Sequence, residues 1–347
     1  MTKNLVLIGY GGMGKRHLDR LEMVDEIEVR GIYDWDADKT MAAQTAGYRT
    51  YDSLDAVLQD QAVDIVLIAT PNDVHKELAI AAMRAGKHVI CEKPVTMAPQ
   101  DFQDILDVAK ETSRCFMVDQ NRRWDENYRM IKKLYDEHTL GRVYDIENRV
   151  QGSRGVPDDW RRTKEHGGGM IYDWCVHLLD RLLILKKKNR LVSLYADTSD
   201  ALGHPVDDGF RIILRFDDNM RAVLEVGTFN FIKLPEWYMS GSTGTAIIKD
   251  FELHGEYVTL EGELAQDTVP VEAGAGFTKT MAPRTDDSIQ HHPLPQVKTD
   301  VCDFYRNFVA WIDGKEEPLV KNSEVMWTLQ VIEKIFESAR ENKVINF

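Results

Sequence analysis

The sequence lacks the features that mark membrane, secreted and zinc proteins. Its 347 residues include only four cysteines, scattered without a C-x-x-C pair or a zinc-binding spacing. No apolar run approaches the roughly 18 residues of a membrane span, and the apolar run before the first glycines is too short for a secretory signal. We therefore expect a cytoplasmic protein with no membrane partner and no metal.

Positive charge is also scarce. The chain has 43 Lys and Arg against 57 Asp and Glu, a formal net charge of −14. Such a protein is repelled by nucleic acid and by anionic membranes. Its basic cluster Lys186–Lys188 follows the apolar run 182–185, and we interpret it as the solvated end of a buried helix. Nucleic acid is not an expected partner.

Short apolar runs alternate with segments of helical length over the first 120 residues. Such runs are typical of a parallel sheet buried on both faces. Because 347 residues exceed one ordinary hydrophobic core, we predict an α/β chain of two domains. The first is a doubly wound Rossmann domain over residues 1–122. Its strands are expected at residues 5–8, 29–33, 63–68, 88–91 and 115–118.

A different pattern begins after residue 122. Apolar and polar residues alternate over 144–150, 210–216 and 222–226, which is typical of antiparallel strands with one wet face. We predict an α+β domain over 123–347 with a large, mostly antiparallel open sheet. The Pro-, Gly-, Thr- and His-rich segment 265–297 is expected to be a long excursion from the core.

A glycine-rich turn opens the chain's first helix. Gly9, Gly11 and Gly14 follow the first strand directly and fit G-x-G-x-x-G. The first glycine allows the tight turn, the second lets the backbone approach a pyrophosphate, and the third lets the helix pack on the strand. Phosphates would then lie against the unpaired N–H groups of the helix N-terminus. This predicts a dinucleotide site that also includes Gly12 and Met13.

Acidic residues follow the second expected strand. Asp34 lies 20 residues after Gly14, where a carboxylate accepts hydrogen bonds from the adenosine ribose. A 2′-phosphate there would face Asp34, Asp36 and Asp38, with no arginine among residues 31–38. We therefore predict NAD as the cofactor, with NADP disfavoured.

Two further motifs carry chemistry. Lys93, within Glu92-Lys93-Pro94, follows a strand at its carboxyl end, where doubly wound sheets bind ligands. Asp173 and His177 follow the glycines 167–169 and are four residues apart, so on a helix they share a face. Apolar neighbours predict that this face is largely buried.

Together these motifs resemble the Gfo/Idh/MocA family of glucose-fructose oxidoreductases, inositol dehydrogenases and related sugar dehydrogenases. The resemblance covers nearly the whole chain. The stretch Gln120–Asp125 resembles the inositol dehydrogenase branch. The matching motifs are Gly9-x-Gly11-x-x-Gly14-x-x-His17, Thr70-Pro71-Asn72-x-x-His75, Glu92-Lys93-Pro94 and Gly167-Gly168-Gly169-x-x-x-Asp173-x-x-x-His177.

The resemblance implies a role for each matched position. Lys93 would lie near the nicotinamide and the reacting hydroxyl, Asp173 would orient that hydroxyl, and His177 would act as general base. His17 either packs its helix or acts in the site. Residues expected to bind the cofactor are Thr70, Pro71, Asn72, His75, Glu92, Lys93, Asn121, Trp160 and Arg161.

The residue types fit hydride transfer at a carbinol carbon. Hydride leaves only as the hydroxyl proton is lost, which suits an imidazole, while an ammonium stabilises the developing alkoxide. We predict an NAD-dependent dehydrogenase of a sugar, polyol or inositol. Alternatives are a keto-sugar reductase, an NAD-assisted glycosidase and a non-catalytic dinucleotide-binding sugar sensor. Relatives of this kind assemble through the open sheet, so a homodimer or homotetramer is expected.

Overall fold

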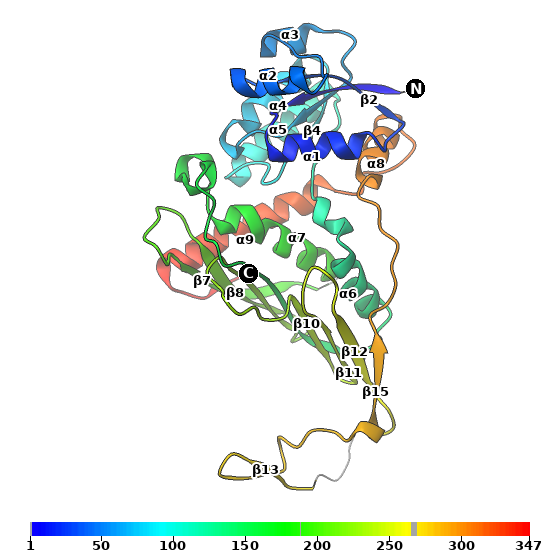
Figure 1. Ribbon diagram of the computed structural model, residues 1–347, viewed down its shortest axis with the longest axis vertical. Coiled ribbons are helices and arrows are strands. Elements are labelled where there is room, and N and C mark those ends of the chain that lie inside the picture. Colours follow the sequence, from blue (N-terminus) through cyan, green and yellow to red (C-terminus); the bar gives the residue numbers. More distant parts are fainter. Residues whose placement is uncertain (1, 188, 265–268) are drawn as a thin grey trace.

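The computed structural model describes residues 2–187, 189–264 and 269–347. Two sheet-based halves lie one above the other, and a narrow arm projects below the second half (Figure 1). Among the described helices, none combines the length and apolar character needed to cross a bilayer.

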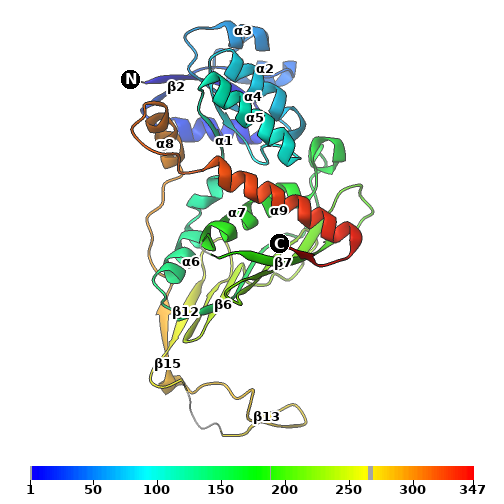
Figure 2. The ribbon, with the colours of Figure 1, turned by 180° about the vertical axis from the view of Figure 1, so that it is seen from behind.

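The first half contains a five-stranded parallel sheet in the order β2-β1-β3-β4-β5. The predicted doubly wound sheet is confirmed. Helix α1 lies on the face toward the reader in Figure 1, while α4 and α5 lie in front in Figure 2, so both faces are covered. Its elements are β1 (Lys3–Ile8), α1 (Gly12–Leu21), β2 (Ile27–Tyr33), α2 (Ala37–Thr45), α3 (Leu54–Gln59), β3 (Ile65–Ile68), α4 (His75–Arg84), β4 (His88–Cys91), α5 (Pro99–Thr112) and β5 (Phe116–Val118).

The strand order reverses direction at β1, which lies between β2 and β3. Ligands of doubly wound sheets bind at such a point, outside the carboxyl ends of the strands. The glycine turn follows β1, Asp34 follows β2, and Glu92 follows β4. Topology therefore gathers the predicted cofactor residues at one edge.

The second half contains a nine-stranded sheet in the order β15-β12-β11-β10-β6-β9-β8-β7-β16. Its strand pairs are antiparallel except for β6 with β9, so the predicted mostly antiparallel open sheet is confirmed. The strands are β6 (Val143–Gln151), β7 (Leu191–Ser199), β8 (Gly209–Phe216), β9 (Arg221–Gly227), β10 (Trp237–Gly241), β11 (Gly244–Ile248), β12 (Gly255–Leu260), β15 (Ile289–Pro293) and β16 (Ile345–Asn346).

Helices α6 (Glu126–Asp136), α7 (Val176–Leu185) and α9 (Asn322–Glu341) cover one face of this sheet. Their apolar side chains form a second core with the inward residues of the strands. This core is separate from that of the parallel sheet. Asp173 lies just before α7 and contacts Lys93, which follows β4, so this region of the second half meets the first.

Near its end, the chain returns to the first half. Helix α8 (Asp303–Ile312) packs Phe304, Tyr305 and Phe308 into the core of the parallel sheet, together with the start of α9. The predicted domain boundary at residue 122 stays a prediction. The core of the first half is built from two distant stretches of sequence, one before residue 125 and one after residue 300. That return is not evident from periodicity alone.

The prediction of a solvated basic cluster is confirmed for Lys187, which is exposed, and is wrong for Lys186. Lys186 is not solvated: it is 1% exposed, its Nζ lies 3.1 Å from the hydroxyl of Tyr135, and it is paired with Asp218. A buried ammonium needs such partners, and Tyr135 lies 51 residues before Lys186, too far for the local pattern to indicate the contact. Lys188 lies outside the described residues.

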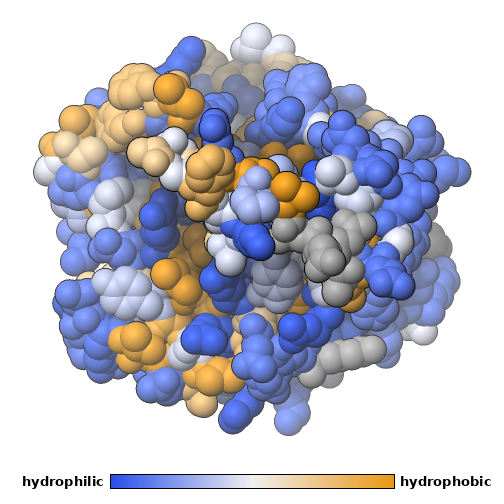
Figure 3. Space-filling view, turned by 90° about the horizontal axis from the view of Figure 1, so that it is seen from below, coloured by the Kyte–Doolittle hydropathy of each residue, from blue (hydrophilic) through white to orange (hydrophobic). Residues whose placement is uncertain are grey.

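The segment 265–297 is only partly an excursion. Residues 265–268 lie outside the described part of the chain. A small hairpin, β13 (Val271–Ala273) with β14 (Gly276–Thr278), forms the projecting arm, but β15 then returns to the sheet edge beside β12. Viewed from below, this end of the molecule mixes apolar and hydrophilic surface (Figure 3).

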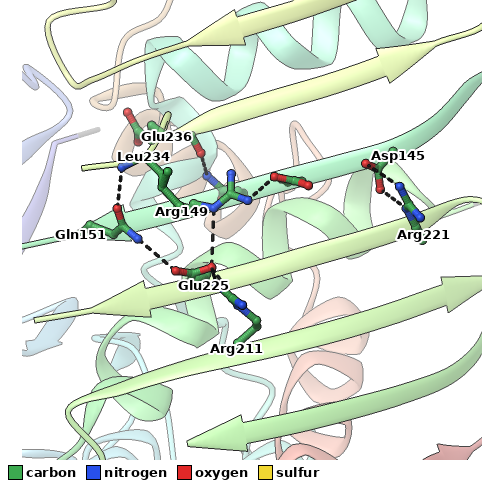
Figure 4. Close-up of polar contacts among 10 residues, drawn as sticks. Asp145, Arg149, Gln151, Arg211, Arg221, Glu225, Leu234 and Glu236 are labelled. Carbon is green, nitrogen blue, oxygen red and sulfur yellow. Dashed lines mark hydrogen bonds and ion pairs between the residues drawn. The ribbon is translucent and has the colours of Figure 1, made fainter. Parts of the chain in front are cut away.

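The other face of the large sheet carries a polar network (Figure 4). Arg221 pairs with Asp145 at 2.7 Å, joining β9 to β6. Glu225 accepts from Arg211 at 2.7 Å and from Gln151 at 3.0 Å. Polar outward residues thus alternate with the apolar inward ones, as the sequence pattern predicted for a sheet with one wet face.

Candidate active site

The glycine turn leaves open space in front of α1. A Cβ at Gly14 would lie 2.1 Å from the carbonyl oxygen of Gly9, so a side chain cannot fit there. By contrast, a Cβ at Gly11 or Gly12 would meet no protein atom within 4 Å. The N-terminus of α1 has no side-chain cap. Free N–H groups beside empty space suit a pyrophosphate.

A cavity of about 430 Å³ lies at this turn. It runs from the end of β2 past the glycines to the chemical motifs. Of the predicted cofactor residues, Gly14, His75 and Asn121 are not among those lining it. The lining residues are Gly9, Gly11, Gly12, Met13, Asp34, Trp35, Lys39, Ala69, Thr70, Pro71, Asn72, Glu92, Lys93, Asp159, Trp160, Arg161 and Asp173.

Asp34 is fixed at one end of the cavity. Its two carboxylate oxygens accept from the backbone N–H groups of Tyr10 at 2.7 Å and Asp36 at 2.9 Å. Trp35 and Lys39 line the same end and were not singled out from the sequence. Lys39 lies one position after the stretch 31–38, which contains no arginine.

The loop after β3 forms one wall. Asn72 donates from its side-chain amide to the carbonyl oxygen of Gly167 at 3.1 Å, which joins the two halves. His75 lies behind this wall and is fully buried, with its ring nitrogens 3.1 Å from the carbonyl oxygen of Pro94 and 3.0 Å from that of Thr70. Burial lowers the pKa of His75. His75 therefore links the loop of Thr70 to the loop of Pro94 by hydrogen bonds.

Glu92 is held by a buried network. One carboxylate oxygen lies 2.9 Å from Nε2 of His17, and the other accepts from the backbone N–H of Lys93 at 3.0 Å. Nδ1 of His17 lies 2.6 Å from the hydroxyl of Tyr305 on α8. Burial opposes the charge of Glu92, but His17 and Lys93 lower its pKa below the ordinary value. His17 thus acts through Glu92 on the loop that carries Lys93.

Two clusters of the described residues have the spacing of a metal site. In the buried one, His17, Glu92 and Asp119, both ring nitrogens of the histidine already have hydrogen-bond partners. Burial and the charge of Glu92 raise the pKa of Asp119 to about 6. Within this cluster His17 and Glu92 are hydrogen-bonded to each other, and Asp119 lies 3.8 Å from the same ring nitrogen of His17. The other cluster, around Asp250 and His254, lies at the surface.

Lys93 meets Asp173 across the two halves. Its ammonium donates to the carboxylate of Asp173 at 3.0 Å and to the backbone carbonyl of the same residue at 2.7 Å. Burial opposes the charge of Asp173, but Lys93 and Arg161 lower its pKa below the ordinary value. Both side chains are only partly exposed. Lys93 and Asp173, which the sequence assigns to the same reacting hydroxyl, are thus in direct contact.

Asp173 and His177 lie on two kinds of helix. Residues Ile171–Cys175 form a π-helical turn, and α7 begins at Val176. Asp207 accepts from the backbone N–H of Ile171 at 2.8 Å and so holds the start of this turn. Single π-helical turns often occur at functional sites. The four-residue spacing predicted a shared face of one helix and could not predict the wider turn.

His177 is buried and has a free ring nitrogen. It is 4% exposed, and Nδ1 has no hydrogen-bond partner among the described residues. Burial and the charges of Lys93 and Arg122 lower its pKa well below the ordinary value. A neutral imidazole next to an ammonium is able to accept a proton. Its ring packs edge-on against Trp174, with 6.2 Å between centroids.

Trp160 and Arg161 line the cavity opposite the glycine turn. The Arg161 guanidinium lies 4.6 Å from the centre of the Trp160 ring and donates to Asp159 at 2.8 Å. Asn121 instead donates to Asp119 at 3.2 Å, behind the cavity. The sequence placed these three residues in one set, whereas the structure separates Asn121 from the other two.

Family models match both halves of the chain. Residues 3–120 match the model described as the oxidoreductase family, NAD-binding Rossmann fold, and residues 128–247 match the GFO/IDH/MocA C-terminal domain. The chain belongs to the Gfo/Idh/MocA oxidoreductase family. The resemblance inferred from its motifs is thereby confirmed, together with an NAD-binding fold.

Proteins similar to this chain include one of known structure, an NAD-binding protein from Listeria innocua. It is 48% identical, with a TM-score of 0.96, and the match covers 100% of this chain and 99% of that one. The scyllo-inositol 2-dehydrogenase (NADP(+)) of Bacillus subtilis is 25% identical over 99% of this chain and 96% of its own. The myo-inositol 2-dehydrogenase of Thermotoga maritima is 26% identical over 63% and 66%.

Proposed function

We propose that this chain is an NAD-dependent dehydrogenase acting on a secondary hydroxyl of a sugar, polyol or inositol, or on the corresponding ketone. One observation carries the proposal: the ammonium of Lys93 contacts Asp173 in the cavity that the glycine turn also lines. The charge of Lys93 also lowers the pKa of His177. The inositol dehydrogenases among the relatives support the substrate class.

The residues at the glycine end fit a dinucleotide. Gly11 and Gly12 leave room that a Cβ would fill, and the N–H groups of α1 are free to bind phosphate oxygens. Asp34 would accept from the adenosine ribose hydroxyls. The bound dinucleotide supplies the hydride acceptor at its nicotinamide ring.

At the other end, three side chains act on the hydroxyl. Asp173 accepts its hydrogen bond and orients it. His177, neutral because of burial, takes the hydroxyl proton. Lys93 stabilises the negative charge that develops on the oxygen. In the reverse direction the ketone carbon receives the hydride, and His177 returns the proton to the oxygen.

We also propose NAD rather than NADP as the physiological cofactor. The carboxylate of Asp34 would repel a 2′-phosphate in a partly desolvated site. Lys39, which lines that end of the cavity, opposes this preference, and one relative is named as NADP-dependent. Comparing kcat/KM for the two cofactors tests the proposal, and a higher value with NADP contradicts it.

A spectrophotometric screen tests the reaction itself. Purified protein and NAD are incubated with inositols, aldoses, sugar acids and their keto forms, and NADH is followed by absorbance. NADH formation with a polyol or sugar is the expected result. Reduction of keto-sugars alone indicates the reductase, and sugar release without net NADH indicates a glycosidase. NADH binding without turnover of any compound indicates a sensor.

We further propose a cytoplasmic homodimer or homotetramer. All four cysteines are unpaired, which suits a reducing compartment. The polar face of the large sheet, in Figure 4, is the surface proposed to meet a second copy. Light scattering on the purified protein measures the assembly, and a monomer at micromolar concentration contradicts the proposal.

A further inference from the structure

Three cations surround Asp173, and each is already paired with a carboxylate. Their charges act together on Asp173 and lower its pKa against the effect of burial. An anionic group approaching any of these three cations would therefore meet a carboxylate already in place. The pairs are Lys93 with Asp173 at 3.0 Å, Arg161 with Asp159 at 2.8 Å, and Arg122 with Asp125 at 3.0 Å.

Arg161 and Asp159 line the cavity, whereas Arg122 and Asp125 are not among its lining residues but are partly exposed. Arg122 and Asp125 are 29% and 28% exposed, and Arg161 is 27% exposed. Arg122 is further held by the ring of Trp174, whose centre lies 4.2 Å from the guanidinium. Trp174 in turn packs against His177. The Arg122–Asp125 pair therefore lies next to the proposed general base.

A fourth cation is close but not reachable. Arg181 is 1% exposed, and its guanidinium is bound to Asp125 at 3.3 Å and to the side chain of Asn148 at 3.1 Å. It lies over the ring of Trp237, 5.2 Å from its centre. Arg181 thus shares the carboxylate of Asp125 with Arg122, and because it is buried it does not contact a substrate.

This pairing penalises an anionic substrate. A substrate carboxylate or phosphate bound to Arg122 or Arg161 would lie close to the carboxylate that the guanidinium already holds. Like charges so placed in a partly desolvated site repel strongly. The formal net charge of −14 adds a repulsive long-range field. Hydroxyl groups can instead donate to the carboxylates and accept from the guanidinium groups without separating the pairs.

We infer that the substrate is an uncharged polyhydroxy compound and that the paired charges around Asp173 discriminate against sugar acids and sugar phosphates. This inference rests on the proposed function, because it names the substrate class of the same site. It assigns a role to Asp125 and Asp159 that the general chemistry of the reaction does not require. Each carboxylate would set specificity by keeping an arginine occupied.

Matched compounds of similar size test the inference. Values of kcat/KM with NAD are measured for myo-inositol against its monophosphate and for glucose against glucuronate. The same compounds are titrated into the NADH complex by calorimetry. We expect the uncharged member of each pair to be favoured by at least about tenfold, the effect of one modest electrostatic penalty.

Two amide substitutions test whether the ion pairs cause the preference for uncharged substrates. Asp159→Asn and Asp125→Asn keep the side-chain size. The first leaves Arg161 with Asp173 alone, at 3.6 Å, and the second removes the carboxylate that Arg122 shares with the buried Arg181. Each should shift the acid-to-neutral ratio toward the acid by about tenfold. The matched control is Asp158→Asn: that carboxylate is 90% exposed and pairs with Arg162 at the surface. The control should leave the ratio unchanged.

The outcomes separate this inference from the proposed function. Preference for the acid or phosphate overturns the inference and leaves the dehydrogenase proposal intact. Turnover of no compound overturns the proposed function, and the calorimetric affinities for the NADH complex then decide the charge preference. Unchanged ratios in both Asp159→Asn and Asp125→Asn also overturn the inference, because the ion pairs would then not be its cause.

Discussion

Lys93 donates to Asp173 twice, once to the carboxylate and once to the backbone carbonyl, at 3.0 and 2.7 Å. The lysine follows β4 of the parallel sheet, and the aspartate lies on the π-helical turn of the second half. The contact with the backbone carbonyl matters because it holds the ammonium in place even when a substrate hydroxyl donates a hydrogen bond to the carboxylate. The two halves of the chain thus share one chemical centre.

Removing either proposed reacting group should stop turnover without unfolding the protein. We expect Lys93→Met and His177→Ala each to lower kcat by about 10²–10⁴-fold, the usual contribution of a positioned acid–base group. NADH affinity, measured by fluorescence titration, should change little, since the glycine turn is untouched. Near-normal turnover in both variants would show that the chemistry occurs elsewhere.

The pH dependence should reflect the buried state of His177. Its pKa is lowered, so the neutral base persists below the ordinary histidine value of about 6.5. We expect the acid limb of kcat/KM for alcohol oxidation to lie below that pH. The same shift costs stability in acid: between pH 6.5 and the lowered pKa the unfolded chain binds the extra proton, so stability falls as pH falls. Urea midpoints at pH 7 and 5, compared with those of His177→Gln, measure this second effect.

Asp34 should control cofactor choice and not the chemical step. Replacing it by alanine removes the carboxylate that faces the ribose and leaves Lys39 at the same end of the cavity. We expect Asp34→Ala to raise KM for NAD and lower KM for NADP, with kcat nearly unchanged. Steady-state kinetics with both cofactors provide the measurement. A large fall in kcat would instead show that Asp34 supports the reacting end.

Two neighbouring glycines should respond to alanine in opposite ways. At Gly14 a Cβ would approach the carbonyl oxygen of Gly9 to 2.1 Å, so Gly14→Ala should lower the free energy of unfolding by about 1–3 kcal/mol. At Gly11 the Cβ meets only open space, so Gly11→Ala should fold normally and weaken NAD binding. Thermal unfolding and NADH titration distinguish the two. Equal loss of stability in both variants would mean that the open space does not serve a ligand.

Local patterns predicted the site's chemistry better than its packing. The glycine turn, Glu92-Lys93-Pro94 and the Asp173–His177 spacing are short-range signals, and each reports a backbone need or a reacting group directly. The role of His17 was left open because its partners Glu92 and Tyr305 are 75 and 288 residues away. No periodicity connects positions so distant.

Charges were the least predictable features. Lys186 looked solvated from its sequence neighbours, but a tyrosine and an aspartate from other elements allow it to be buried. Asn121 was grouped with the cofactor residues by its motif, although it faces Asp119 behind the cavity. A charged or amide side chain has several low-energy destinations, and tertiary partners decide among them.

The return of α8 to the parallel sheet has a consequence for biosynthesis. Phe304, Tyr305 and Phe308 complete a core whose strands end at residue 118. During synthesis, this core keeps apolar surface uncovered until about 190 further residues, from 118 to 308, have been made. At ordinary synthesis rates this takes roughly 10–40 s. A fragment ending near residue 122 would keep that surface exposed, and we expect it to aggregate when expressed alone.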